Sequence, residues 1–322
     1  MSCQMKISLV TPAGKQSRAG NRTTAVRWAR ILRGLGHTVT ISEQDTGSDA
    51  DMMVAVHAWR SHASIRAFSE AHPDRKLIVL LAGTDIYGFQ HSHPEETLDS
   101  MARADALVGL HDLVHRAIPK KFVKKLHIIH QSSPPLSTPR TPSKRTFDVC
   151  VVGHLRAEKD SLRAAYAARL AEPGSKLRVI HLGKAHDAKW EADARAEMKR
   201  NPRYDWRGEV PGWAVRRQFA RCHAMVISSV MEGGANVVSE AVVAGLPVIV
   251  SDIDGNVGLL GADYEGYYTV TDTASLAEML HRAETDPRFL KRLAAQGGKL
   301  QKLFTPEREA AAWRRLLCEL AG

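Results

Sequence analysis

Short apolar segments alternate with amphipathic ones along the chain, and this alternation constrains the fold more than any other feature of the sequence. In the first half, runs typical of buried strands lie at residues 6–10, 37–41, 52–56, 76–81 and 106–109. Apolar residues recur at helical spacing in 23–35, 61–71, 95–103 and 111–117, and loops are expected at 11–20 and 82–88. Strands and helices that alternate at this pace form parallel pairs with right-handed crossovers. The pattern therefore predicts an α/β protein with a doubly wound parallel sheet.

A proline-rich stretch separates this half from a second half of the same kind. Residues 132–146 hold four prolines, Pro134, Pro135, Pro139 and Pro142, which is typical of a semi-rigid exposed connector. Strand-like runs return at 148–153, 177–182, 224–228 and 246–250, and helical spacing at 161–170, 187–199, 215–221, 237–244, 275–284 and 307–320. We expect a first domain at 1–133, a linker at 134–146, a second domain at 147–304 and a last helix, 305–322, that packs back on the first domain. Two Rossmann-like domains of this type face each other across a cleft, where open parallel sheets bind ligands.

The segment 228–252, SSVMEGGANVVSEAVVAGLPVIVSD, carries the most chemical information. A strand runs into a glycine-rich loop, Asn236 is a suitable N-cap, and Gly245 ends the helix that follows. Such a loop offers backbone N–H groups and the positive end of a helix dipole, which suit phosphate oxygens. Glu232 and Glu240 flank the loop, where carboxylates suit sugar and ribose hydroxyls, Glu240 being placed for the ribose. The alternative is that both glutamates face solvent.

A second group of anion-binding side chains follows the first strand. The loop after that strand, which precedes a helix N-terminus, carries groups that suit a small phosphate-like trianion: Gly14, Lys15, Arg18, Asn21, Arg22, Thr23 and Thr24. Arginine offers a two-pronged donor for such oxygens and lysine a point charge. The chain has 45 Lys and Arg against 35 Asp and Glu, a net charge of +10, which favours anionic partners. The alternative is that Arg18 and Arg22 only face solvent.

The E-x7-E spacing of Glu232 and Glu240, with the GGAN loop, resembles the donor-site signature of glycosyltransferase family 4, which consists of retaining enzymes of the GT-B architecture. The segment 153–159, GHLRAEK, resembles that family's G-R-L-x-x-x-K motif, and 207–210, RGEV, resembles its base-binding turn. The segment 80–87, LLAGTDIY, resembles its H-G-T-D-x-Y segment. His154 stands in place of the usual arginine and Ala82 in place of the usual histidine, and both are departures from the family pattern.

This resemblance implies a role for each matching residue. The implied catalytic set is Glu232, Lys159, Arg156 and Asp85. The implied binding set for the donor nucleotide sugar is His154, Gly208, Glu209, Val210, Gly233, Gly234, Ala235, Asn236 and Glu240. GT-B enzymes of this type have no obligatory metal, so the resemblance implies no metal and no other cofactor. Fixed cations and a helix dipole would then stabilise the charge of the leaving group.

A narrower set of motifs resembles the selenosugar synthases, one branch of that family. The motifs are TPAGKQSRAGNRTTA at 11–25, HAWRS at 57–61, GTDIY at 83–87 and DIDGNVGLLG at 252–261. They imply a UDP-N-acetylhexosamine donor, a selenophosphate acceptor and a 1-selenosugar product with a carbon–selenium bond. The implied acceptor-binding residues are Gly14, Lys15, Asn21, Arg22, Thr23, His57, Arg60 and Thr84.

Other features of the sequence narrow the class of protein. The four cysteines lie far apart, which is typical of reduced thiols, and His91 and His93 lack the acidic partners of a metal site. The N-terminal residues do not resemble a signal peptide and no apolar run is long enough for a bilayer, so we expect a cytoplasmic protein. Aromatic residues make up 6% of the chain and no nucleic-acid motif occurs, so no nucleic-acid partner is expected.

Two other functions stay open at this point. The first is a family 4 enzyme with a sugar or lipid hydroxyl as acceptor, held at a membrane by the basic run at 120–125, which is otherwise a solvated face. The second is a non-catalytic basic binding protein on a degenerate GT-B scaffold, which the departures at His154 and Ala82 allow.

Overall fold

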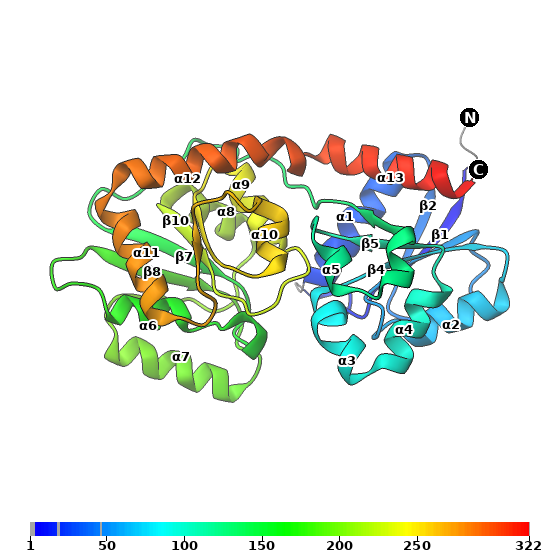
Figure 1. Ribbon diagram of the computed structural model, residues 1–322, viewed down its shortest axis with the longest axis horizontal. Coiled ribbons are helices and arrows are strands. Elements are labelled where there is room, and N and C mark those ends of the chain that lie inside the picture. The colour runs from blue at the N-terminus through cyan, green and yellow to red at the C-terminus, as the bar shows by residue number, and fades with distance from the viewer. Residues whose placement is uncertain (1–3, 18–19, 46, 322) are drawn as a thin grey trace. The chain divides into compact units, whose positions relative to one another are not determined.

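The computed structural model describes residues 4–17, 20–45 and 47–321 (Figure 1). The chain divides into two compact units. Unit 1 consists of Met1–Ser132, Glu232–Asn236 and Thr305–Gly322, and unit 2 of Ser133–Met231 and Val237–Phe304. The short segment Glu232–Asn236 therefore groups with the first half of the chain, although it lies in the middle of the second half.

Unit 1 is built on a parallel sheet, which has six strands among the described residues, in the order β2-β1-β3-β4-β5-β6. The strands are β1 (Lys6–Val10), β2 (Thr38–Ser42), β3 (Met52–Val56), β4 (Lys76–Leu80), β5 (Ala106–Gly109) and β6 (Leu126–Ile128). The helices are α1 (Gly20–Gly34), α2 (His62–Ala71), the π-helix η1 (Asp85–Phe89), α3 (Gln90–Ser92), α4 (Pro94–Arg103), α5 (Val114–Ala117), the 3-10 helix η2 (Lys120–Lys125) and α13 (Pro306–Ala321).

The sheet of unit 1 has a core on each face, because successive strand residues point to opposite sides. In β3, Val54 contributes to the cluster that contains Trp28 of α1 and Trp313 of α13, whereas Met53 contributes to the cluster that contains Phe68 of α2. The two tryptophan rings pack edge to face, with centroids 4.7 Å apart. The C-terminal helix α13 thus lies against α1 and covers the same face of the sheet (Figure 1).

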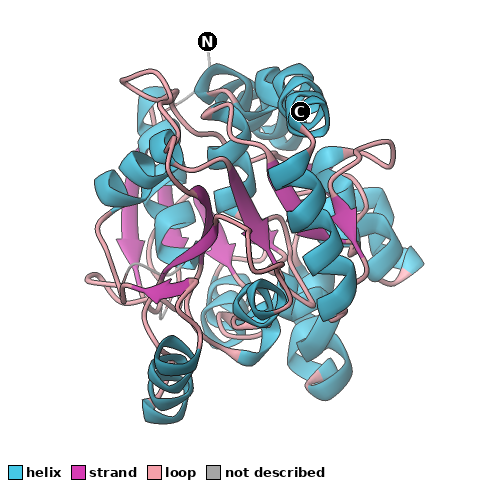
Figure 2. Ribbon diagram, turned by 90° about the vertical axis from the view of Figure 1, so that its left-hand side faces the viewer, coloured by secondary structure: helices cyan, strands magenta, loops and turns pink. Residues whose placement is uncertain are grey.

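Unit 2 repeats this architecture, and the part of it that is described has a parallel sheet of six strands in the order β12-β11-β10-β7-β8-β9. Figure 2 shows strands of a sheet with helices on both sides. The strands are β7 (Phe147–Val152), β8 (Leu177–Leu182), β9 (Tyr204–Trp206), β10 (Ala224–Ile227), β11 (Val248–Ser251) and β12 (Tyr267–Tyr268). The helices are η3 (Ala157–Lys159), α6 (Arg163–Arg169), α7 (Ala188–Arg200), α8 (Gly212–Arg221), α9 (Asn236–Val243), α10 (Asp254–Leu260), α11 (Thr273–Thr285), α12 (Pro287–Leu300) and η4 (Gln301–Phe304).

The predicted α/β class with two doubly wound parallel sheets is confirmed, and three local predictions are wrong. The stretch 82–88 is largely helical rather than a loop, since η1 starts at Asp85. The helix α1 starts at Gly20, earlier than expected, so Asn21 to Thr23 form its first turn and are not in a loop. Asn236 is the first residue of α9 and not the residue before it. Gly245 does end the helix in a left-handed conformation (φ +69°), with Leu246 N–H donating to the Ala241 carbonyl at 2.9 Å.

Candidate functional site

In unit 2, the segment that resembles the pyrophosphate-binding motif is the loop between β7 and α6. The loop leaves β7 at Gly153, whose carbonyl accepts a hydrogen bond of 3.1 Å from the buried His181 of β8. Gly183, which follows β8, packs so closely on Gly153 that a Cβ at position 183 would lie 1.8 Å from the Gly153 carbonyl oxygen. The end of β8 therefore fixes the start of the loop, and position 183 requires glycine.

The other end of this loop is fixed to the strand β10. The Ser228 hydroxyl donates to the carbonyls of Lys159 and Asp160, each at 3.0 Å. The Val230 N–H donates to the Glu158 carbonyl, also at 3.0 Å. The backbone of Lys159 is thus held beside the strand that leads into the E-x7-E segment.

The imidazole of His154 does not replace the positive charge of the usual arginine. Its Nδ1 accepts a hydrogen bond of 3.1 Å from the Lys184 N–H. Burial, and next the positive charge of Arg156, lower the pKa of His154, while the carboxylate of Glu209 acts in the opposite direction. A neutral ring therefore holds the loop, and the cations of this segment are Arg156 and Lys159.

Arg156 is only partly satisfied by its neighbours. Its Nη1 lies 3.1 Å from Glu158 Oε1, and its Nε is buried without a hydrogen-bond partner. Buried donors in proteins are nearly always paired, so an unpaired one at a site calls for an explanation. An anionic ligand on this loop would supply the missing acceptor.

The predicted base-binding turn and the second glutamate also lie in unit 2. Gly208 has a left-handed backbone (φ +68°) and its carbonyl accepts the Gly183 N–H at 2.8 Å, which places the turn Gly208–Val210 beside the start of the β7–α6 loop. Glu209 is exposed and Val210 half-buried. Glu240 is half-buried on α9, one turn after Asn236, so the two side chains share one face of the helix.

In unit 1, the segment Glu232–Asn236 packs backbone to backbone on the turn that follows β4. A Cβ on Gly233 would lie 2.3 Å from the Gly83 nitrogen, and one on Gly83 would lie 2.4 Å from the Gly233 nitrogen. Gly234 is left-handed (φ +108°), and a Cβ there would lie 2.5 Å from the Leu110 Cβ. Glycine is thus required at these positions by contact, and the backbone of Glu232, a residue that is 7% exposed, lies beside Gly83, since a Cβ there would be 2.8 Å from the Glu232 carbonyl carbon.

His57, Thr84 and Asp85 form one hydrogen-bonded cluster at the ends of β3 and β4. His57 Nδ1 lies 2.7 Å from Asp85 Oδ1, and His57 Nε2 lies 3.0 Å from Thr84 Oγ1. The fully buried carboxylate of Asp85 also accepts the N–H groups of Ala58 at 2.8 Å, Trp59 at 3.0 Å and Ala82 at 2.9 Å. These bonds hold the carboxylate of Asp85 against His57, and the catalytic role that the sequence resemblance implies for Asp85 stays a prediction.

His57 itself has a strained backbone, with φ +81° in a residue that is not glycine. Such strain costs about 1–3 kcal/mol and is common at functional sites. Beside it, the Trp59 and Phe89 rings stack with centroids 4.0 Å apart, and the exposed Arg60 guanidinium lies 6.0 and 5.9 Å from them. Sequence reasoning singled out Arg60 but missed this aromatic surface.

The remaining predicted acceptor residues lie before and within the first turn of α1. Gly14 lies near the Glu43 carboxylate, and Lys15 is exposed. Asn21 and Thr23 are at the start of the helix, and Arg22 Nε is buried there without a hydrogen-bond partner. Thr24, by contrast, is buried and accepts a bond of 2.8 Å from Gln131, which is a structural role. Arg18 lies outside the described residues.

The structure therefore gathers the predicted residues in two groups. In unit 2 it brings together His154, Arg156, Lys159 and the turn at 208–210. In unit 1 it brings together His57, Thr84, Asp85 and the segment Glu232–Asn236. The supports that sequence reasoning missed are His181, Gly183, Gly83 and the stacked pair Trp59 and Phe89, which are recognisable only from their tertiary contacts.

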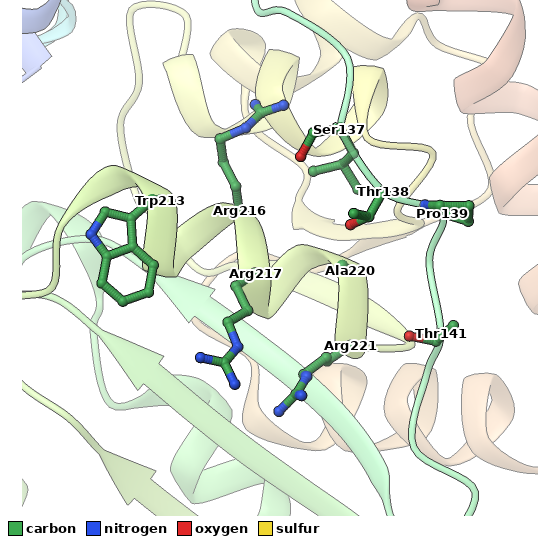
Figure 3. Close-up of a pocket in the computed structure, with 10 residues that line it drawn as sticks. Ser137, Thr138, Pro139, Thr141, Trp213, Arg216, Arg217, Ala220 and Arg221 are labelled. Atoms are coloured by element: carbon green, nitrogen blue, oxygen red, sulfur yellow. The ribbon is translucent and has the colours of Figure 1, made fainter.

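A pocket of about 560 Å³ lies elsewhere on unit 2, between the connector and α8 (Figure 3). Its described lining residues are Leu136, Ser137, Thr138, Pro139, Thr141, Trp213, Arg216, Arg217, Ala220 and Arg221. They include none of the candidate catalytic or binding residues singled out from the sequence. The Arg216 guanidinium points toward the connector, where it donates to the carbonyls of Pro134 and Pro135.

Within the described part of the chain, no group of three His, Cys, Asp or Glu side chains is arranged as metal ligands would be. The absence of a metal requirement stays a prediction. None of the described helices combines the length and the apolar character that crossing a bilayer demands.

The arrangement of parallel strands defines the class of protein once it is compared with solved structures. Anabaena Alr3699/HepE in complex with UDP and glucose has 14% sequence identity and a TM-score of 0.79, with 98% of this chain and 100% of that chain covered. Sucrose-phosphate synthase (tll1590) from Thermosynechococcus elongatus has 14% identity and a TM-score of 0.77, with 99% of each chain covered. A point mutant of S. aureus TarM, in complex with Fondaparinux, alpha-GlcNAc-glycerol and UDP, has 13% sequence identity and a TM-score of 0.65, with 83% of this chain and 55% of that chain covered. At these identities the likeness shows the fold, which is GT-B.

The family follows from the sequence of the second half. The family model of glycosyl transferases group 1 matches residues 138–300, half of the chain. The chain belongs to this family. No curated protein sequence matches it.

Proposed function

We propose that the protein transfers an N-acetylhexosamine from its UDP-activated form to selenophosphate. The observation that carries the proposal is the glycine-packed loop Glu232–Asn236, which runs into α9 with Glu240 one turn later, in a chain of this glycosyltransferase family. The similar HepE structure contains UDP and glucose, and the TarM structure contains UDP and alpha-GlcNAc-glycerol. These ligands support a UDP-sugar as donor here.

Each part of the donor has a residue with matching chemistry. We assign the ribose hydroxyls to the carboxylate of Glu240 and the base to the backbone of the turn Gly208–Val210. The pyrophosphate is assigned to Lys159, to Arg156 with its unpaired Nε, and to the N-terminus of α9, whose N–H groups and dipole favour anions. Glu232 is assigned to a hydroxyl of the donor sugar.

The acceptor is assigned to the start of α1. A sugar or lipid alcohol needs no cluster of cations, whereas a small trianion does. Arg22, whose Nε lacks a partner, and Lys15 supply the charge, while Asn21 and Thr23 supply further hydrogen bonds. His57, held by Asp85, would orient the acceptor together with Thr84 and Arg60.

The reaction follows from the chemistry of the two substrates. The selenium of selenophosphate attacks C1 of the sugar while the bond from C1 to the β-phosphate oxygen breaks, and the electron pair leaves with UDP. The cations Lys159 and Arg156 and the N-terminus of α9 stabilise the charge that grows on the β-phosphate. Selenium in this ion is already anionic, so no strong general base is needed. Water then cleaves the selenium–phosphorus bond and releases phosphate and the 1-selenosugar. Glycosyltransferases of family 4 retain the configuration at C1, so we expect retention here. Attack of selenium on the face of C1 opposite the leaving UDP would instead invert it.

One observation keeps a hydroxyl acceptor as a second candidate. The basic run Lys120–Lys125 is a 3-10 helix that buries Phe122 and leaves Lys120, Lys121 and Lys124 at or near the surface. A cationic surface of this kind attracts anionic headgroups, and a lipid-linked sugar would then be the acceptor.

The test is an incubation with UDP-N-acetylglucosamine and selenophosphate, followed by mass spectrometry for UDP and for a selenium-containing sugar. The proposal predicts both products in equal amounts, and little UDP when phosphate or water replaces selenophosphate. UDP release only with lipid or sugar alcohols would favour the second candidate. If no acceptor causes UDP release and UDP does not bind, the result would favour the non-catalytic binding protein instead.

A further inference from the structure

Arg27 of α1 connects two parts of unit 1 that are far apart in the sequence. Its Nη1 donates to Asn236 Oδ1 at 2.8 Å, and its Nε lies 3.1 Å from Glu309 Oε2. Asn236 is the first residue of α9, and Glu309 lies in the first turn of α13. One guanidinium thus joins the C-terminal helix to the start of the helix whose N-terminus faces the proposed donor phosphate.

The carboxylate of Glu309 is built to hold this guanidinium. It is fully buried and accepts the Trp28 indole N–H at 2.9 Å and the Ser132 backbone N–H at 2.8 Å. A buried carboxylate needs a cation as well as hydrogen bonds, because desolvation of the charge is costly. Arg27, with a side chain that is only 16% exposed, is that cation.

The other end of the guanidinium fixes the loop. The Asn236 side chain also lies against the start of α1, since a Cβ on Gly20 would be 3.9 Å from Asn236 Nδ2. The segment before Asn236 is wedged on Gly83 and Leu110 by contacts that allow only glycine at positions 233 and 234. Arg27 therefore adds a side-chain hydrogen bond to a loop whose glycines are held by close packing.

Arg27 Nη2 is buried without a hydrogen-bond partner, which is an energetic cost in the folded protein. The guanidinium is oriented for Asn236 and Glu309 at the expense of this third donor. A buried donor without a protein partner calls for an explanation, and the orientation that Asn236 and Glu309 impose on the guanidinium supplies one.

We propose that Arg27 is a positioning residue for donor binding, which it serves by fixing Asn236 and the N-terminal N–H groups of α9, with Glu309 as its anchor. The inference rests on the proposed use of this helix end for the pyrophosphate of the donor. Lysine at position 27 would keep the charge that Glu309 needs but would lose the fork that reaches Asn236. The single substitution Arg27→Lys therefore removes the contact with Asn236 while it keeps the positive charge beside Glu309.

The test compares Arg27→Lys with Arg30→Lys, an exposed arginine on the same helix that serves as the matched control. Calorimetry with UDP is expected to give a Kd about tenfold or more higher for Arg27→Lys, with a melting temperature close to that of the wild type. The donor KM should rise more than kcat falls. Arg30→Lys should leave all three unchanged.

A second variant guards against misfolding. Arg27→Gln combined with Glu309→Gln leaves no unpaired buried charge, and it should fold yet bind UDP as weakly as Arg27→Lys. Hydrogen exchange of the amides at 233–237 without ligand should be about tenfold faster in both variants. Unchanged exchange and unchanged UDP affinity in either folded variant would overturn the inference. If the wild type binds no UDP, faster exchange in the variants would still show that Arg27 holds Asn236 in place, but the proposed function, and with it the role of Arg27 in donor binding, would be refuted.

Discussion

Replacement of Gly233 by alanine tests how the loop Glu232–Asn236 is held. The added Cβ would lie 2.3 Å from the Gly83 nitrogen and 2.7 Å from its Cα, whereas ordinary contacts of a Cβ begin near 3.4 Å. Both partners are backbone, so no side chain can rotate away and the loop must move by about 1 Å. Overpacking of this kind costs about 1–3 kcal/mol of unfolding free energy. A displacement of that size at a site can lower activity about 100-fold.

The assay is kcat/KM for UDP release, with UDP affinity by calorimetry and the melting temperature measured on the same samples. Gly83→Ala creates the same clash from the other side, so it should cause a similar loss, and the two changes together should cost less than the sum of the single ones. Gly34→Ala is the control, because a Cβ on this last residue of α1 meets nothing within 4 Å, so stability and UDP affinity should stay close to those of the wild type. Wild-type affinity and stability in Gly233→Ala would refute the packing argument.

Three further predictions concern other parts of the molecule. Glu240→Ala should raise the donor KM at least tenfold, because the ribose loses its acceptor, and an unchanged donor KM would contradict the ribose assignment. Arg22→Ala should raise the acceptor KM and leave the Kd for UDP intact, whereas equal losses of both would argue against separate anion sites. Burial lowers the pKa of His181 from 6.5 to about 4, so the unfolded chain binds the proton more tightly and stability falls on acidification. His181 should account for about 3 kcal/mol of unfolding free energy lost between pH 7 and 4, and denaturant titrations of His181→Gln should show a flatter pH dependence.

The strands that the sequence reveals best are those buried on both faces. Met52–Val56 and Leu177–Leu182 coincide with the prediction, because a strand covered on both faces is mostly apolar: MMVAV is apolar throughout, and LRVIHL is apolar except at Arg178 and His181. The strands β6, β9 and β12 were not predicted, since two or three residues at or near a sheet edge give no periodic signal. The helix α10 was missed for a different reason, because its sequence DGNVGLL is poor in helix formers.

The helix α12 was also missed, although its start signals are present in the sequence. Asp286 caps it by accepting the Arg288 N–H at 2.9 Å, and Pro287 occupies the first helical position. The sequence of 82–88, by contrast, carries no such start signal for a helix. Its helical character depends on Asp85, whose carboxylate holds the N–H groups of three residues from two different strand ends, a tertiary arrangement.

The candidate site, too, could be predicted only in part. Glu232, Glu240 and Lys159 could be singled out because they match two motifs of fixed spacing in the family that the sequence resembles. The partners that hold them could not, because Gly83 meets Gly233 across 150 residues of chain, and Arg27 meets Glu309 across 282. The neutral state of His154 likewise depends on burial and on the N–H of Lys184, which no motif encodes.

The central claim is that the start of α9 and Glu240 hold a uridine diphosphate sugar. A crystal structure of the protein with UDP tests it most directly. We predict a phosphate oxygen within hydrogen-bond distance of the Asn236 backbone N–H and a ribose hydroxyl on Glu240. UDP bound in the α8 pocket at Arg217 and Arg221, with α9 unoccupied, would contradict it.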